Sequence, residues 1–232
     1  MKIEIEWAGQ VEYLDAWERQ KRMVAARSEN PDRLGKLLLL EHPHTYTLGR
    51  RGNSENLLWD EAMLAERGVA VHRVDRGGDI TYHGPGQLVG YPILNLQQMG
   101  RYGLARIKSY VHDLEEILIQ AVAFFGIDAQ RYEGFTGVWV DTPDGLEKIA
   151  AIGVHINNQG VTSHGFALNV ATDLDYFSGI VPCGIPNHGV TSMEKVLGRP
   201  FLTADLILPI TTAFEQIFHV QLEDRARENI RF

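Results

Sequence analysis

The sequence has only one cysteine, Cys183, no long apolar run and no excess of positive charge. A single cysteine excludes an intramolecular disulfide, and with it the small secreted proteins that disulfides hold together. No stretch approaches the roughly 18 uninterrupted apolar residues that a membrane-spanning helix needs. Residues 1–7 alternate charged and apolar side chains, which is unlike a signal peptide. We therefore expect a cytoplasmic protein with no membrane partner.

Charge and composition exclude further classes of protein. The chain has 22 basic and 30 acidic side chains and a formal net charge of −8, whereas a general nucleic-acid binder carries a basic excess. Hydrophobic residues make up 44% and charged residues 22% of the 232 residues, as in a packed domain and unlike a disordered chain. No repeat or Pro/Ser-rich linker divides the sequence. We predict a single domain over residues 1–232, whose C-terminal part could form a small helical lobe.

The apolar periodicity predicts strands in clusters, with a few long helices between them. Leu37–Leu40 form a continuous apolar run that is typical of a strand buried on both faces. Residues 56–67, 104–125 and 203–218 are predicted helices, because apolar side chains recur at three- and four-residue spacing or a glycine ends the pattern. Residues 11–27 are also predicted to form a helix, and the candidates for its buried side are Leu14, Trp17, Met23 and Val24. This order favours an α/β (α+β) fold of mixed β-sheets packed with helices over a regular βαβ repeat.

The densest group of functional side chains is the segment Arg76–Gln87, which reads RGGDITYHGPGQ. Glycines and a proline bracket a short extended stretch with a threonine, a tyrosine and a histidine. Glycine allows a backbone to approach a ligand closely, but the same pattern also fits a tight hairpin with exposed polar residues. The spacing matches neither the dinucleotide-binding GxGxxG, nor the phosphate-binding GxxxxGK[ST], nor the GxSxG nucleophile elbow. The segment is therefore a candidate site without a nucleotide fingerprint.

Lys148 begins the apolar run KIAAIG, which we predict to be a strand. Strict alternation puts Lys148 on the face of Ala150 and Ile152, opposite Ala151 and Gly153. Burial there disfavours the charged ammonium and favours a role as a base. The alternative is that the lysine only starts the strand and extends into water.

Cys183 lies between a proline and a glycine in a predicted loop. A lone cysteine is more often a small buried hydrophobe than a nucleophile. A thiolate needs a nearby base or cation, because a free cysteine with a pKa near ~8.5 is mostly protonated at neutral pH. His83 or Lys148 could be that base or cation, if the fold brings either residue close to Cys183.

The stretch His164–Asn169 is a predicted strand with small residues on one face. Gly165 and Ala167 share that face and could form the floor of a site for an acyl chain, while Phe166 and Leu168 point into the core. The alternative is an ordinary strand that contains a glycine. The nine histidines form neither an HExxH motif nor a Cys/His array, so we expect no bound metal.

Taken together, these segments resemble the lipoyl(octanoyl) transferase family. The motif RGGxxTYHGPGQ is the specific part of the likeness, and the matching segments follow the family's order over most of the chain. They are Glu41–Pro43, Tyr46–Arg51, Arg76–Gln87, Lys148–Gly153, His164–Asn169 and Pro182–Ile185. The resemblance implies the fold of biotin and lipoate ligases and implies no cofactor.

The resemblance also implies a reaction in protein lipoylation. An octanoyl (or lipoyl) group leaves octanoyl-acyl carrier protein, forms a thioester on Cys183 and ends on a lysine of a lipoyl domain. The implied acceptors are the lipoyl domains of 2-oxoacid dehydrogenase E2 subunits and the glycine cleavage H protein. Lys148 would lower the pKa of the Cys183 thiol. The implied substrate-site residues are Arg76, Gly77, Gly78, Asp79, Ile80, Thr81, Tyr82, His83, Ala151, Ile152, Gly153, Gly165, Phe166 and Ala167.

Two alternatives stay open. An ATP-dependent lipoate or biotin ligase of the same fold would need an adenylate-binding loop, to which Gly49–Gly52 is faintly similar, but no cysteine. A non-catalytic protein that binds acyl groups or lipoyl domains would not need Lys148 and Cys183 together. Exchange between two thioesters is almost neutral in free energy, so a transferase needs no nucleotide, and Cys183 in its Pro-Cys-Gly turn favours the transferase.

Overall fold

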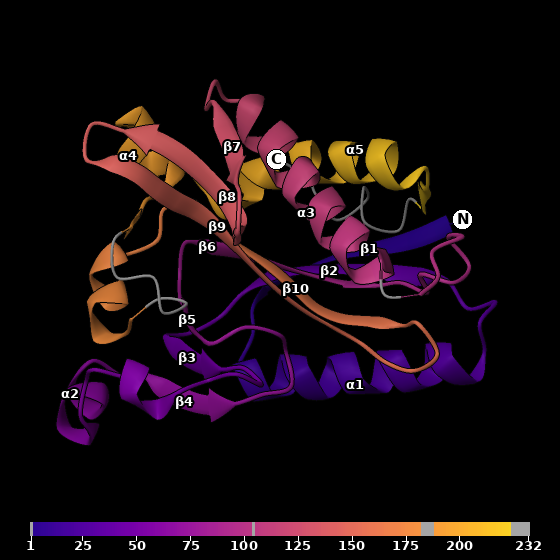
Figure 1. Ribbon diagram of the computed structural model, residues 1–232, viewed down its shortest axis with the longest axis horizontal. Coiled ribbons are helices and arrows are strands. Elements are labelled where there is room, and N and C mark those ends of the chain that lie inside the picture. Colours follow the sequence, from indigo (N-terminus) through magenta and orange to yellow (C-terminus); the bar gives the residue numbers. More distant parts are fainter. Residues whose placement is uncertain (1, 104, 182–187, 224–232) are drawn as a thin grey trace.

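The computed structural model describes residues 2–103, 105–181 and 188–223 (Figure 1). Most of its strands belong to one large sheet: β1 (Lys2–Gln10), β2 (Gly35–Glu41), β6 (Gln87–Ile93), β7 (Ala129–Tyr132), β8 (Phe135–Thr142), β9 (Gly145–Ile156), β10 (Thr162–Asn169), β11 (Gly189–Val190) and β12 (Gln221–Glu223). Within the described residues these nine strands follow the order β12-β1-β2-β6-β10-β9-β8-β7, with β11 beside β9. From β2 to β7 neighbouring strands are antiparallel, whereas β1 runs parallel to β2 and β12.

A second, smaller sheet carries the glycine-rich segment. It consists of β3 (Thr45–Leu48), β4 (Ala70–Arg73) and β5 (Ile80–His83), in the order β4-β3-β5. The helix predicted over residues 56–67 is shorter in the structure, where α2 covers only Glu61–Glu66. Asp60 caps its start by accepting a hydrogen bond from the Met63 N–H. This sheet has an apolar core of its own, formed by buried residues that include Tyr46, Leu48, Ile80, Tyr82 and Ile180.

Helices and the small sheet cover the two faces of the large sheet. In the view of Figure 1, α3 (Ala105–Ala123) and α5 (Ile207–Phe218) lie above it, and α1 (Tyr13–Glu29) and the small sheet lie below. Helix α4 (Met193–Leu197) and three short 3-10 turns, Ser54–Asn56, Leu174–Gly179 and Thr203–Leu206, complete the described elements. The predicted architecture of mixed sheets packed with helices is confirmed.

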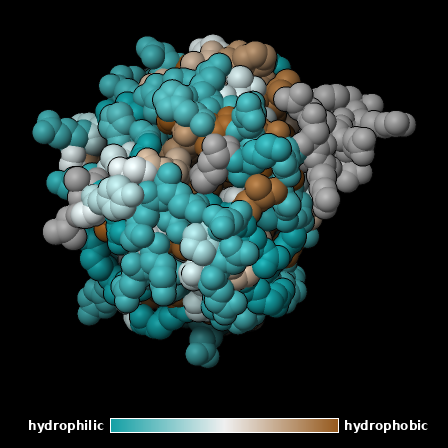
Figure 2. All heavy atoms as spheres, turned by 90° about the vertical axis from the view of Figure 1, so that its right-hand side faces the viewer, coloured by the Kyte–Doolittle hydropathy of each residue, from teal (hydrophilic) through white to brown (hydrophobic). Residues whose placement is uncertain are grey.

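The run of four leucines in β2 is buried on both faces, as predicted. Leu37 and Leu39 belong to the core under α3 and α5, whereas Leu38 and Leu40 belong to the core under α1. Successive side chains of a strand point to opposite faces, so one strand supplies both cores. Apolar side chains gather in these two cores. The face at the right of Figure 1 is mainly hydrophilic (Figure 2). No helix in the described parts of the chain is both long and apolar enough to cross a membrane.

Helix α1 buries only part of the side that its apolar residues predict, since Trp17, Met23 and Val24 are half-buried. Leu14 is 47% exposed, and the buried residues are Tyr13, Ala16, Gln20 and Arg27. Beside the apolar cluster of Leu38 and Leu40, the face of the sheet under α1 also carries polar side chains. Tyr13 packs against His42 and His83, and Gln20 accepts a hydrogen bond from the backbone N–H of His164.

The orientation of α1 predicts the effect of two chemically identical substitutions. Leu14→Ala should change the free energy of unfolding by no more than about 0.5 kcal/mol, because the side chain is exposed. The matched control, Leu39→Ala, removes the same atoms from a fully buried position and should cost about 2–5 kcal/mol. Urea denaturation measures both values. A cost at Leu14 as large as that at Leu39 would contradict the orientation.

Candidate active site

The loop between β4 and β5 joins the small sheet to the large one. The N–H of Gly77 donates to the carbonyl of Val154 on β9 over 2.9 Å. The turn after β3 is held to the same loop, because the Arg50 N–H donates to the Arg76 carbonyl over 2.9 Å. A Cβ on Gly153 would lie only 3.0 Å from the Gly77 oxygen, so glycine at this position permits the close approach of the two sheets.

We call the contact of the β4–β5 loop with β9 the joint between the two sheets. The side chain of Arg76 is buried there, with 7% of the residue exposed. Its Nη2 donates to the Thr47 carbonyl over 2.5 Å and to the Thr47 hydroxyl over 2.9 Å, and Nη1 donates to the Gly77 carbonyl over 3.0 Å. These hydrogen bonds satisfy much of a buried guanidinium and fix it beside the cavity described next.

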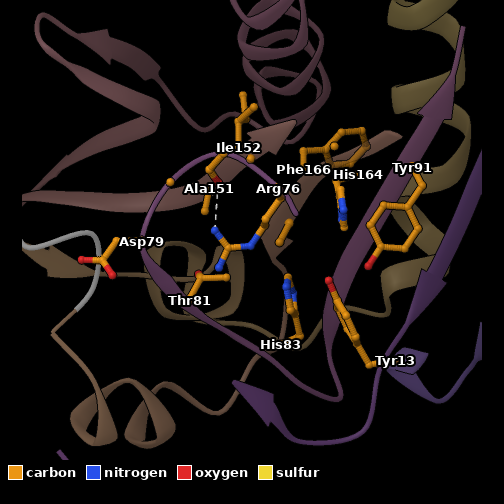
Figure 3. Close-up of a pocket in the computed structure, with 15 residues that line it drawn as sticks. Tyr13, Arg76, Asp79, Thr81, His83, Tyr91, Ala151, Ile152, His164 and Phe166 are labelled. Atoms are coloured by element: carbon orange, nitrogen blue, oxygen red, sulfur yellow. Dashed lines mark hydrogen bonds between the residues drawn. The ribbon is translucent and has the colours of Figure 1, made fainter. Parts of the chain in front are cut away.

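A cavity of about 50 Å³ lies between the joint and strand β10 (Figure 3). Asp79 lies at one end of the view, whereas Tyr13, Tyr91 and His164 lie at the other. The walls come from α1, the glycine-rich loop, β5, β6, β9 and β10. The lining residues are Tyr13, Arg76, Gly77, Gly78, Asp79, Thr81, His83, Tyr91, Ala151, Ile152, Gly153, His164, Gly165, Phe166 and Ala167.

Aromatic and imidazole side chains form the end of the cavity near α1. The rings of Tyr13 and His83 stack with their centroids 5.7 Å apart, and His83 Nδ1 lies 2.9 Å from Gln87 Oε1. Burial lowers the pKa of His83 well below its ordinary value, and the charge of Arg76 lowers it further. Burial also lowers the pKa of His42, which lies against Tyr91, to about 4. At neutral pH both imidazoles are therefore uncharged, and His83 is suited to orienting a ligand.

A chain of hydrogen bonds leads from His83 to the segment that follows Cys183 in the sequence. Gln87 Nε2 donates to Asn169 Oδ1 over 2.9 Å, and Asn169 Nδ2 donates to the Thr191 carbonyl over 3.0 Å. These residues are buried. The network accounts for the polar residues of HGPGQ and the asparagine of HGFALN, because their side chains join β5, β6, β10 and the residue that follows β11.

Lys148 lines an open groove of about 580 Å³ that continues from the cavity. The groove and the cavity share the walls Gly77–Asp79 and Ala151–Gly153. The predicted face of Lys148 is wrong, because the register between β8 and β9 shifts. Trp139 pairs with Lys148 and Val138 with Ala150, which leaves Ile149 as an extra residue. This bulge turns Lys148 to the side of Ala151 and Gly153 and puts Ile149 and Ala150 in the core.

The Lys148 side chain is held near aromatic and carbonyl groups. Its Nζ donates to the Thr136 carbonyl over 3.1 Å and lies 4.7 Å from the centroid of the Trp139 ring. Both contacts favour an ammonium at this position. The residue is 8% exposed, so the alternative in which it extends into water is wrong.

Cys183 itself lies outside the described residues, but both neighbouring segments are fixed. Before it, the Val181 N–H donates to the Asn56 carbonyl over 2.8 Å. After it, the ring of His188 packs against Trp139, and Val190 pairs with Lys148 in the sheet. The chain therefore leaves the small sheet and rejoins the large sheet beside Lys148.

Most of the substrate-site residues implied by the resemblance surround one cavity. Ile80 and Tyr82 do not line it, because alternation along β5 turns their side chains into the core of the small sheet, while Thr81 and His83 face the cavity. Residues that the sequence reasoning missed also line it: Tyr13, Tyr91 and His164. Only His164 had a sequence signal, since it directly precedes Gly165 in the matched HGFALN stretch.

Comparisons with known proteins agree with this geometry. Residues 12–215 match the family described as "Lipoyl protein ligase A/B catalytic domain". An octanoyltransferase of Acidobacterium capsulatum is 50% identical over 207 residues, covering 86% of this chain and 83% of the relative. An octanoyltransferase of Caldicellulosiruptor bescii is 44% identical, covering 99% of this chain and 97% of the relative.

Solved structures with low sequence identity share the fold. A bipartite lipoate protein ligase from Thermoplasma acidophilum, studied with its E2 lipoyl domain, superposes with a TM-score of 0.71 at 17% identity, covering 96% of this chain and 86% of that one. The biotin protein ligase of Aquifex aeolicus gives 0.52 at 12% identity, covering 94% and 70%. The predicted likeness to biotin and lipoate ligases is confirmed. The chain belongs to the lipoyl protein ligase A/B catalytic-domain family and, within it, to the octanoyltransferases, the acyltransferases of protein lipoylation.

Proposed function

We propose that this chain, as one catalytic unit over residues 1–232, transfers its octanoyl group through a thioester on Cys183, with Lys148 as the proton carrier. The observation that supports this most is the bulge at Ile149, which turns Lys148 into a groove that is continuous with the cavity. Strand β11, which follows Cys183 by a few residues, pairs with Lys148 itself. A thiol that passes its proton to a neighbouring amine becomes a thiolate, which is the nucleophilic form, and the ammonium formed in the same step stabilises it.

Each half of the reaction is an exchange at one carbonyl carbon. The Cys183 thiol passes its proton to Lys148, its sulfur bonds to the acyl carbon, and the donor's carbon–sulfur bond breaks. The donor leaves as a thiol with that proton. The amine of the acceptor lysine then bonds to the acyl carbon as the bond to Cys183 breaks, and the amine's proton returns to the Cys183 sulfur through Lys148. No nucleotide takes part, which separates this proposal from an ATP-dependent ligase.

The cavity is the site that we propose for the acyl chain. Its walls at Ala151–Gly153 and Gly165–Ala167 are small or apolar, and Arg76 is held in place by Thr47. With the acyl carbonyl near Lys148, the chain would extend along the shared walls toward Tyr91 and His164. His83 would orient the substrate and is not the base, because its pKa is lowered and its Nδ1 is bound by Gln87.

The partners that we propose are octanoyl-acyl carrier protein as donor and lipoyl domains as acceptors, in the cytoplasm. A reducing compartment suits a reaction that depends on the single free cysteine. Both partners are generally acidic by the family resemblance, and this chain carries a net charge of −8, so docking requires a local basic patch. Arg50 and Arg51 are exposed beside the groove, and in the described parts of the chain neither forms an ion pair with a carboxylate. Arg76 is no part of this patch, since it is buried.

The role of Lys148 predicts that Lys148→Arg loses octanoyl transfer by about a hundredfold or more, because a guanidinium keeps the charge but does not give up its proton. Transfer from octanoyl-acyl carrier protein to a lipoyl domain is followed by mass spectrometry. The matched control is Lys195→Arg, since Lys195 is a neighbouring lysine that binds Glu147 over 3.0 Å outside the groove. Full activity of a folded Lys148→Arg protein would show that the lysine acts only as a cation.

The docking patch predicts a donor-dependent effect of charge reversal. Arg50→Glu with Arg51→Glu should raise the KM for octanoyl-acyl carrier protein about tenfold, through slower association, and should affect a short octanoyl thioester much less. Arg22→Glu with Arg33→Glu is the matched control, because it changes the net charge equally at exposed residues outside the groove. Equal losses with the two donors would mean that Arg50 and Arg51 serve the acyl site or the fold.

A further inference from the structure

The end of the cavity remote from Lys148 presents a buried nitrogen atom without a partner. His164 is 1% exposed, and its Nδ1 has no hydrogen-bond partner in the part of the chain that the structure describes. The ring lines the cavity near Tyr91 and Phe166 (Figure 3). An unpaired polar atom destabilises a buried site, so the arrangement is explained if a ligand supplies the missing partner.

Asp75 decides which nitrogen of His164 carries a proton. His164 Nε2 lies 2.7 Å from Asp75 Oδ1, which also accepts a hydrogen bond from Trp17 Nε1 over 3.2 Å. The hydrogen bond from His164 holds the pKa of Asp75 well below its usual range, so the carboxylate is ionised and acts as an acceptor. Nε2 must therefore donate, and in the neutral ring the unpartnered Nδ1 keeps a lone pair that can accept a hydrogen bond.

The backbone of His164 is also constrained. Its φ angle is +55°, a left-handed conformation that is uncommon for a residue other than glycine. Gln20 Oε1 accepts a hydrogen bond from the His164 N–H over 2.7 Å. Strained backbone of this kind persists where surrounding contacts fix it, and it is concentrated at ligand sites. Asp75 holds the ring and Gln20 holds the backbone, so His164 is presented to the cavity in one orientation.

We propose, on the basis of the proposed function, that His164 is a specificity-determining residue that recognises the end of the acyl chain opposite the reacting carbonyl. Its Nδ1 accepts a hydrogen bond from a hydroxyl or thiol group carried at that end. The groove with Lys148 and the cavity share two walls, but His164 lines only the cavity, so it meets the chain end and not the carbonyl. A chain that ends in a methyl group leaves Nδ1 unpaired, whereas a chain that ends in a donor satisfies it.

The test compares short thioester donors that differ only at the chain end. Nonanoyl and 8-hydroxyoctanoyl groups have nearly the same size, and 8-mercaptooctanoyl separates a thiol from a hydroxyl donor. For the wild-type protein, kcat/KM should be about three- to tenfold higher with 8-hydroxyoctanoyl than with nonanoyl. In His164→Asn the ratio should fall to about one, since asparagine tolerates the left-handed backbone but is too short to replace the ring.

The matched control is His155→Asn. His155 lies 4.0 Å from the other oxygen of Asp75 but outside the cavity, so the ratio should stay as in the wild type. Equal rates with the two chains in the wild-type protein would overturn the proposal. They would mean that Nδ1 is satisfied inside the protein. The side-chain amide of Gln20, which already contacts the His164 backbone and whose Nε2 also lacks a described partner, could supply that donor.

The same reactions report separately on the proposed function. The intact mass of the wild-type protein after mixing with each donor shows whether Cys183 carries the acyl group, whatever the ratio of the rates. Acylation at equal rates overturns only the role of His164. No acylation of Cys183 by any donor overturns the proposed function itself.

Discussion

The structure of the site depends on one contact between two sheets, the hydrogen bond from the Gly77 N–H to the Val154 carbonyl. The small sheet carries His83 and, in its β4–β5 loop, Arg76, whereas the large sheet carries Lys148, Ala151 and His164. Neither sheet alone encloses the cavity, because its walls come from both. The glycines at the joint follow from this constraint, since a Cβ on Gly153 would lie 3.0 Å from the Gly77 oxygen and force the sheets apart.

The chemistry is divided along the continuous space that this joint creates. Lys148 lies in the open groove, where a bulge and a Trp139 ring hold its ammonium near the segments that flank Cys183. The cavity is lined by small and apolar residues near the joint and by buried imidazole and phenol groups near α1. In the proposed reaction, the reacting carbonyl would lie in the groove beside Lys148 and the chain end in the cavity, so the two environments would serve different purposes.

The sequence predicted the parts of this arrangement that depend on local pattern. The burial of Leu37–Leu40 on both faces is such a part. The convergence of three motif segments on one cavity was implied by the family resemblance and not by local pattern. Tertiary contacts decided the rest. Strict alternation put Lys148 on the wrong face, because no sequence pattern marks the extra residue Ile149. Apolar periodicity put Leu14 inside, because it cannot show that α1 packs on polar groups, and for the same reason it missed Tyr13.

The central claim is that the acyl group passes through Cys183 beside Lys148. The most direct measurement is the intact mass of the protein after brief mixing with octanoyl-acyl carrier protein in the absence of acceptor and of ATP, followed by peptide mapping. The account predicts one octanoyl group per chain, located on Cys183, which leaves the protein when a lipoyl domain is added and does not form in Cys183→Ala. Full turnover by the folded Cys183→Ala protein, or an octanoyl group on any other residue that passes to the lipoyl domain, would contradict it.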